Sequence, residues 1–130
     1  MIVVRDRAYN CEIEFAFSLI AGKWKTDILW ELTKEPGLGF NELMRRLPGV
    51  ASKVLAKALD ELEDALLVAR DAFNGIPSRV EYRLTDSGLE LWKRCEPLIG
   101  WAHGHAADLE RERERVRAKA VKKTEAKESA

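Results

Sequence analysis

Two short helical patterns on either side of a proline–glycine turn constrain the fold of this chain more than any other feature. The first predicted helix covers residues 40–47, and Pro48 and Gly49 interrupt it. The second predicted helix begins at residue 51 or 52 and ends near residue 66. Two helices joined by a tight, glycine-containing turn form a helix-turn-helix unit, whose second helix can enter the major groove of DNA.

A predicted β-hairpin follows the second helix directly. Residues 68–72 and 79–84 form its strands, and apolar and polar residues alternate along the second strand, as in a half-buried strand. The connecting loop contains Asn74 and Gly75, a pair that favours tight turns. We therefore expect a mainly α-helical fold with one small β-hairpin, which is the architecture of a winged helix-turn-helix.

Further helices are predicted on both sides of this unit. Residues 12–20 are apolar nearly all round, so this helix must be buried on both sides, and one side could be a subunit interface. Residues 23–33 form the next helix. After the hairpin, we expect Thr85 to cap a helix that extends to about Trp101, with a kink or a break at Pro97.

The C-terminal residues are rich in charge. Residues 108–130 carry eight basic and six acidic side chains. Residues 110–123 have only sparse apolar positions, so they form either an exposed helix held by Glu–Arg pairs or a disordered tail. The expected organisation is a winged helix-turn-helix domain over residues 1–107 and a charged tail over residues 108–130.

Composition excludes several classes of protein. A chain of 130 residues is one domain with at most an appendage, and no apolar run approaches the ~20 residues that span a bilayer. The N-terminus has no apolar stretch typical of a secretory signal. Two cysteines far apart do not indicate a disulfide framework, so we expect a reducing, cytoplasmic location. Because the formal net charge is zero, any phosphate-binding surface must come from segregated charge.

The outward face of the second predicted helix changes character along its length. Leucines at helical spacing form the expected core stripe, namely Leu55, Leu59, Leu62 and Leu66. The opposite face is basic at its N-terminal end, with Lys53 and Lys57. It is acidic at its C-terminal end, with Asp60, Glu61 and Asp64. Recognition helices contact base edges with their N-terminal residues, but a plain solvated helix face explains the same pattern equally well.

The order and spacing of short motifs resemble the HxlR-type family of bacterial winged-helix transcription regulators, which are relatives of the MarR group. Cys11 is followed by Gly-Lys-Trp-Lys at 22–25, Phe-Asn-Glu-Leu at 40–43, Leu-Pro-Gly-Val at 47–50 and Val-Glu-Tyr at 80–82. The resemblance covers about residues 11–101. It implies a homodimer whose N- and C-terminal helices pack across a two-fold axis. Each subunit would present a recognition helix and a wing to double-stranded DNA, at a pseudo-palindromic operator.

The chain departs from the family pattern at five positions. It has Gly39 where the family usually has Arg, Ala51 in place of Ser, Ala56 in place of Thr, Leu66 in place of Gly, and Glu12 in place of Pro. Ser52 could cap the helix one residue later. Three of these changes remove side chains that could hydrogen-bond or pair with phosphate. A second hypothesis is therefore a winged-helix module that binds another protein and has weak or lost DNA binding.

Specific residues are predicted to contact DNA. Lys53 and Lys57 can reach guanine acceptors or phosphates, and Val54 can touch a thymine methyl group. A wing arginine could enter the minor groove, or be an ordinary surface residue. Of the two arginines before the turn, one is expected to pair with a nearby carboxylate. The full set of candidates is Ser52, Lys53, Val54, Lys57, Arg45, Arg46, Asn74 and Arg79.

Cys11 is a candidate redox sensor, because the matching cysteine senses oxidants or electrophiles in several HxlR-type regulators. Its thiolate would be favoured at a helix N-terminus and opposed by Glu12 and Glu14; a small packed apolar residue is the alternative interpretation. Cys95 is expected to be a packing residue.

Other chemistry is not indicated. His103 and His105 point in separate directions on a helix, so a metal site is not expected. The four tryptophans fit a core and a dimer interface, no cofactor is implied, and no catalytic constellation indicates an enzyme. An effector pocket between the dimer helices and the DNA-binding lobe is possible, as in MarR relatives.

Overall fold

The computed structural model describes residues 1–129, and the chain divides into two compact units, one covering Met1–Trp92 and one beginning at Lys93. The elements in chain order are β1 (Ile2–Val4), β2 (Arg7–Tyr9), α1 (Glu12–Ile20), α2 (Lys25–Thr33), α3 (Phe40–Arg46), α4 (Ser52–Asp64), β3 (Val68–Phe73), β4 (Arg79–Leu84), α5 (Asp86–Cys95) and α6 (Pro97–Ser129). The predicted mainly α-helical fold with one wing hairpin is confirmed.

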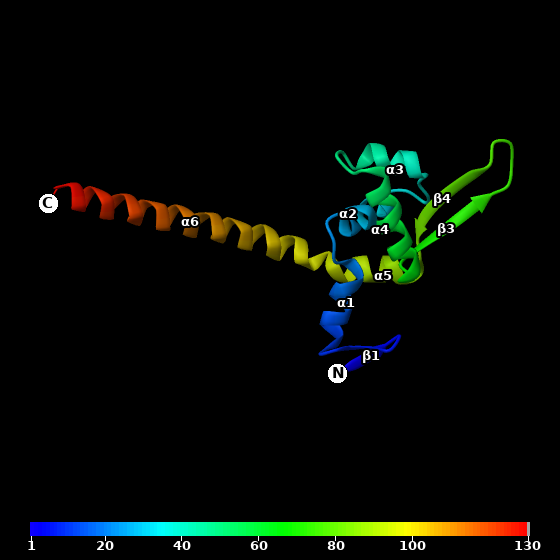
Figure 1. Ribbon diagram of the computed structural model, residues 1–130, viewed down its shortest axis with the longest axis horizontal. Helices are drawn as coiled ribbons and strands as arrows, with labels where there is room; N and C mark the ends of the chain where they lie inside the picture. The colour runs from blue at the N-terminus through cyan, green and yellow to red at the C-terminus, as the bar shows by residue number, and fades with distance from the viewer. Residues whose placement is uncertain (130) are drawn as a thin grey trace. The chain divides into compact units, whose positions relative to one another are not determined.

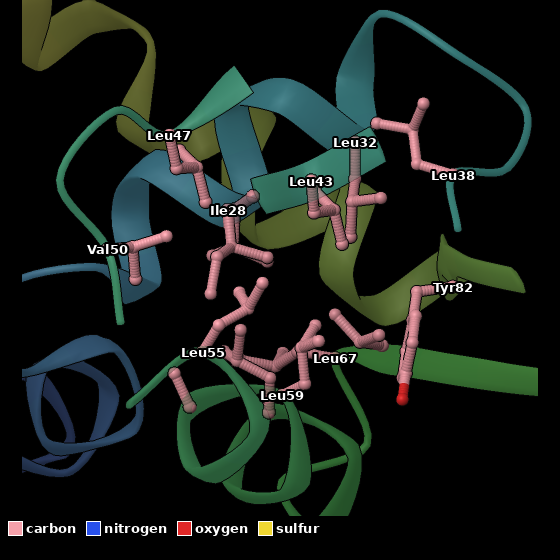
Figure 2. Packing of buried hydrophobic residues seen from close by; sticks show 14 residues of the cluster. Ile28, Leu32, Leu38, Leu43, Leu47, Val50, Leu55, Leu59, Leu67 and Tyr82 are labelled. Atoms are coloured by element: carbon pink, nitrogen blue, oxygen red, sulfur yellow. The ribbon is translucent and has the colours of Figure 1, made fainter. Parts of the chain in front are cut away.

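The core of the first unit lies between α2, α3, α4 and the base of the hairpin (Figure 2). Each helix contributes fully buried aliphatic side chains, with Ile28 from α2, Leu43 from α3, and Leu55 and Leu59 from α4 all at 0% exposure. Burying such a side chain contributes roughly 1.5–3 kcal/mol. The core therefore fixes α4 against α2 and α3 and leaves its opposite face outside.

The wing is an antiparallel hairpin whose register runs from Val68 opposite Leu84 to Phe73 opposite Arg79. It extends away from the three helices (Figure 1). Its base is anchored by a β-bridge, in which Leu38 and Tyr82 exchange backbone hydrogen bonds of 2.9 and 2.8 Å. The loop between α2 and α3 thus fixes the direction of the wing relative to the helix-turn-helix.

Leu66 does not belong to the core stripe, and that prediction was wrong. Helix α4 ends at Asp64, and Leu66 is 68% exposed with a left-handed φ of 63°. The Leu66 N–H donates to the Glu63 carbonyl, and the Leu67 N–H donates to the Leu62 carbonyl, both at 3.0 Å. This is a Schellman motif in which leucine occupies the position that usually holds glycine. The reversal places Leu67 and Val68 in the core instead.

The N-terminal residues form a hairpin that the sequence analysis missed. Strands β1 and β2 pair antiparallel, and Arg5 and Asp6 in the turn both have positive φ. Three-residue strands leave too short an alternation pattern to recognise in a sequence. The helix after α1 begins at Lys25, two residues later than predicted.

Helix α1 is only partly buried within the chain, whereas we expected an apolar helix to be buried on both sides. Ile13 is 63% exposed and Phe17 is 55% exposed. The first unit therefore covers only one side of α1.

The predicted cap and break in the C-terminal helices are confirmed. The Thr85 hydroxyl accepts a hydrogen bond from the Gly88 N–H at 3.0 Å, which caps α5. Helix α5 ends at Cys95 and α6 begins at Pro97, because proline fits the first turn of a helix and not its interior.

The tail was predicted to be either an exposed helix or disordered, and in the structure it is helical. Helix α6 runs without interruption past residue 107, where we expected the domain to end; that functional boundary stays a prediction.

Candidate nucleic-acid interface

Helix α4 carries the candidate contact residues on its exposed face. Its N-cap is Ala51, which has extended backbone angles and no side chain that can accept a hydrogen bond. Ser52 is the first helical residue, so the prediction that it replaces the missing cap was wrong. The next exposed side chains are Lys53, Val54 and Lys57, and Val54 is 46% exposed. They lie opposite the leucines that pack into the core.

Ion pairs compensate two of the four carboxylates at the C-terminal end of α4. Lys25, at the start of α2, pairs with Glu61 at 2.6 Å, and its side chain is only 12% exposed. Arg5, in the turn of the N-terminal hairpin, pairs with Asp64 at 2.8 Å. The hydrogen bond from Lys25, helped by its positive charge, lowers the pKa of Glu61. The sequence analysis missed both compensating cations; Arg5 carries no sequence cue, because it lies 59 residues from its partner.

Helix α3 presents one arginine and uses the other internally. Arg46 pairs with Glu35 at 3.0 Å and with Glu31 at 3.5 Å, and the hydrogen bond to Glu35 raises the pKa of the guanidinium. Arg45 is exposed and has no ion pair among the described contacts. This is the division predicted from the sequence, in which one arginine pairs with a carboxylate. The Glu42 carboxylate accepts a 3.4 Å hydrogen bond from the Gly39 N–H, so α3 keeps half of a capping box without a polar cap side chain.

The wing exposes its loop, and two of its strand arginines, Arg79 and Arg83, are ion-paired. Asn74 lies in the loop between β3 and β4, and its side chain is exposed. Arg79 pairs with Glu81 and lies 6.0 Å from the centre of the Phe73 ring. Arg83 pairs across the hairpin with Asp71 at 2.8 Å. A role for Arg79 in DNA binding would therefore require it to exchange Glu81 for phosphate.

Cys11 occupies the N-cap of α1, and it is exposed. Two carboxylates, Glu12 and Glu14, lie in the first turn of the same helix. The Glu14 carboxylate accepts a 2.6 Å hydrogen bond from the Asn10 N–H. Cys95 is half-buried.

A cavity of about 760 Å³ lies between the N-terminal hairpin, α1 and the C-terminal half of α4. Aromatic and aliphatic side chains line one part of it, including Tyr9, Phe15 and Leu19. Lys57 and Asp60 of α4 line another part. The cavity therefore contacts the same helix that carries the candidate DNA contacts.

Two further features are missing from residues 1–129. No cluster of three or more His, Cys, Asp or Glu side chains could hold a metal ion. None of the helices is both long and apolar enough to cross a membrane.

Helices α2, α3 and α4 followed by the β3–β4 hairpin define a winged helix-turn-helix protein. A model of the HxlR-like helix-turn-helix family matches residues 19–110. MalR of Fusobacterium mortiferum, provisionally described as a regulatory protein, is 38% identical over 97 residues, which cover 75% of this chain and 92% of MalR.

Solved structures agree with this family. A provisionally assigned MarR-family transcriptional regulator from Enterococcus faecalis V583 has a TM-score of 0.71 and 36% identity, over 83% of this chain and 97% of its own. The redox regulator HypR in its reduced form has a TM-score of 0.70 and 30% identity, over 77% of this chain and 98% of its own. This chain belongs to the HxlR-like helix-turn-helix family, and it is a transcriptional regulator of the helix-turn-helix type. Regulators of this family are not enzymes.

Proposed function

We propose that this regulator binds double-stranded operator DNA as a homodimer, with α4 in the major groove and the wing on the flanking backbone. The observation that carries this proposal is the charge distribution on α4. Its N-terminal half exposes Lys53 and Lys57, whereas Glu61 and Asp64 at the other end are paired with cations from other elements. The compensation reduces repulsion of phosphates, although Asp60 stays exposed and without an ion pair among the described contacts.

The remaining candidates take supporting roles. Ser52 and Val54 are exposed beside Lys53, where a hydroxyl and a methyl group can contact base edges. Arg45 on α3 and Asn74 in the wing loop are exposed and fit phosphate contacts. Arg46 contributes by orienting α3 through its pairs with Glu31 and Glu35.

Exposed apolar side chains in each unit support homodimerisation. Helix α1 exposes Ile13 and Phe17, and α6 exposes Leu98, Ile99 and Trp101. Apolar groups of this size gain about 25 cal/mol for each Å² that a partner removes from water. A second copy of the chain, packed across a two-fold axis, would bury them.

The direct test is fluorescence anisotropy of the protein against its own upstream intergenic DNA and a scrambled duplex. We expect the Lys53→Ala/Lys57→Ala variant to lose at least about tenfold in affinity for the upstream DNA, because each good base contact contributes about 1–3 kcal/mol. Lys34→Ala is the control, since Lys34 is an exposed lysine at the C-cap of α2 that pairs with Glu31. Unchanged affinity of the double variant would refute the α4 contacts. Equal, weak binding of the wild type to both duplexes would favour the protein-interaction module.

A redox response through Cys11 is a second part of the proposal. It rests on the exposed position of the thiol at a helix N-terminus and on the similarity to the redox regulator HypR. Mild oxidation is expected to reduce binding to the upstream DNA, and Cys11→Ser is expected to abolish that loss. Cys95→Ser is the matched control, and an oxidation response that survives Cys11→Ser would exclude Cys11 as the sensor.

The cavity beside α4 is the proposed place for a small-molecule effector. It is lined by the aromatic Tyr9 and Phe15 and by Lys57 of the recognition helix. A ligand bound there would act on DNA binding through Lys57.

A further inference from the structure

Charge is strongly segregated along the part of α6 that lies beyond the family match. The match ends at residue 110, and α6 continues to Ser129. Residues 115–123 carry five basic and no acidic side chains, whereas residues 108–114 carry two basic and four acidic ones. The block 115–123 is therefore the most positive stretch of a chain whose net charge is zero.

Four of the five basic side chains of this block lie on one face of the helix, and Arg117 lies on another. Lys119, Lys122 and Lys123 follow Arg115 at intervals of four, seven and eight residues, which are the spacings of one helix face. All four are exposed. At a rise of 1.5 Å per residue, they span about 12 Å along the helix axis.

These lysines differ from the preceding arginines in that the arginines form ion pairs and the lysines do not. Each of Arg111, Arg113 and Arg115 pairs with the carboxylate three residues earlier, namely Asp108, Glu110 and Glu112. The Glu112 hydrogen bond also raises the pKa of Arg115. Within residues 1–129, no ion pair involves Lys119, Lys122 or Lys123. Their charge is uncompensated along the helix.

We propose that residues 115–123 of α6 form a second DNA-binding element that contacts backbone phosphates without reading sequence. This inference rests on the proposed function, since it adds a contact to the same duplex. Lysine ammonium groups bind phosphates as point charges and carry no geometric preference for a base. The two valines of the block, Val116 and Val121, lie five residues apart and thus on different faces, so the block lacks the apolar stripe that a protein partner needs.

The proposal predicts a specific salt dependence. Each phosphate contact adds about 0.9 to the slope of log affinity against log salt concentration. Replacing three contacting lysines lowers that slope by about 2.7 per subunit. Between 50 and 200 mM salt, the affinity of the wild type then falls about 40-fold more than that of the variant.

The test measures binding of the full chain to its upstream DNA and to a random duplex over this salt range. The variant is Lys119→Gln/Lys122→Gln/Lys123→Gln, and circular dichroism checks that α6 stays helical. Arg111→Gln/Arg113→Gln is the control, because it removes two cations that lie outside the block and already have carboxylate partners. Lys119→Arg/Lys122→Arg/Lys123→Arg keeps the charge and is expected to keep the wild-type slope.

A smaller slope on both duplexes, for the lysine-to-glutamine variant alone, supports the second contact. An unchanged slope on the random duplex overturns it, even where specific binding to the upstream DNA is intact. A wild type that binds the upstream DNA no better than the random duplex refutes the proposed function instead. The salt slopes on the random duplex then still decide whether α6 contacts phosphates.

Discussion

At the scale of single residues, Leu66 shows how one backbone position redirects the chain. Leucine at the left-handed C′ position of α4 lets Leu67 and Val68 enter the core, although an L-residue with a Cβ is strained there. The helical spacing of the leucines predicted Leu66 in the core, because this spacing continues in the sequence beyond the residue at which the helix ends. The hydrogen bonds of the Schellman motif, which form only in the folded chain, stop the helix first.

Leu66→Gly is expected to stabilise the protein. Relief of the left-handed strain is worth roughly 1–2 kcal/mol, and the added freedom of glycine in the unfolded chain offsets roughly 0.5–1 kcal/mol of it. Little burial is lost, since Leu66 is 68% exposed. Urea unfolding should show a free energy of unfolding raised by about 0.5–1 kcal/mol. Leu66→Ala keeps the Cβ and is the control; an equal gain from alanine would contradict the strain argument.

At the scale of elements, α4 depends on α2 for its electrostatics. Lys25 and Glu61 were both visible in the sequence, but their 2.6 Å contact is made by packing of α2 against α4. Carboxylates at the C-terminal end of α4 repel phosphates, and the ion pairs with Lys25 and Arg5 reduce that repulsion.

This ion pair predicts a dependence of stability on pH. The folded pKa of Glu61 lies below its ordinary value of about 4.3, so the contribution to stability is complete above that value. It is lost as the pH falls through the lower, folded pKa. Glu61→Gln should therefore lower the melting temperature at pH 7, and the difference from the wild type should shrink in acid.

The control for this prediction is Asp60→Asn, which removes the same charge from the same helix. Asp60 takes part in no ion pair among the described contacts, so its variant should not show the loss at pH 7. A pH-independent difference for Glu61→Gln would contradict the role of the Lys25 pair.

At the scale of the whole molecule, the exposed apolar face of α1 predicts association. Phe17 and Ile13 are more than half exposed in a helix that is apolar nearly all round. We expect Ile13→Asp/Phe17→Asp to convert a dimer into a monomer, because two carboxylates would be buried without partners. Analytical ultracentrifugation measures the mass directly.

Ile76→Asp is the control for association, since Ile76 is fully exposed at the wing tip and away from α1. It should leave the dimer intact. A wild type that is monomeric at micromolar concentration, or a double variant that stays dimeric, would refute the assignment of α1 to the interface.

The sequence by itself determined the order and type of the helices from α1 to α5, the wing, and the breaks at Pro48–Gly49 and Pro97. These follow from local rules, because helical periodicity, strand alternation and the restrictions of proline and glycine act over a few residues. It also identified the exposed lysines of α4, since the face opposite a leucine stripe is set by helix geometry.

Tertiary structure alone decided which charges are compensated. Arg5 reaches Asp64 across 59 positions, Lys25 reaches Glu61, and Arg46 rather than Arg45 reaches Glu35. It also decided that α4 stops before Leu66. Short stretches of sequence do not predict such contacts. They form only when packing brings distant elements within a few ångströms and the desolvated charges need partners.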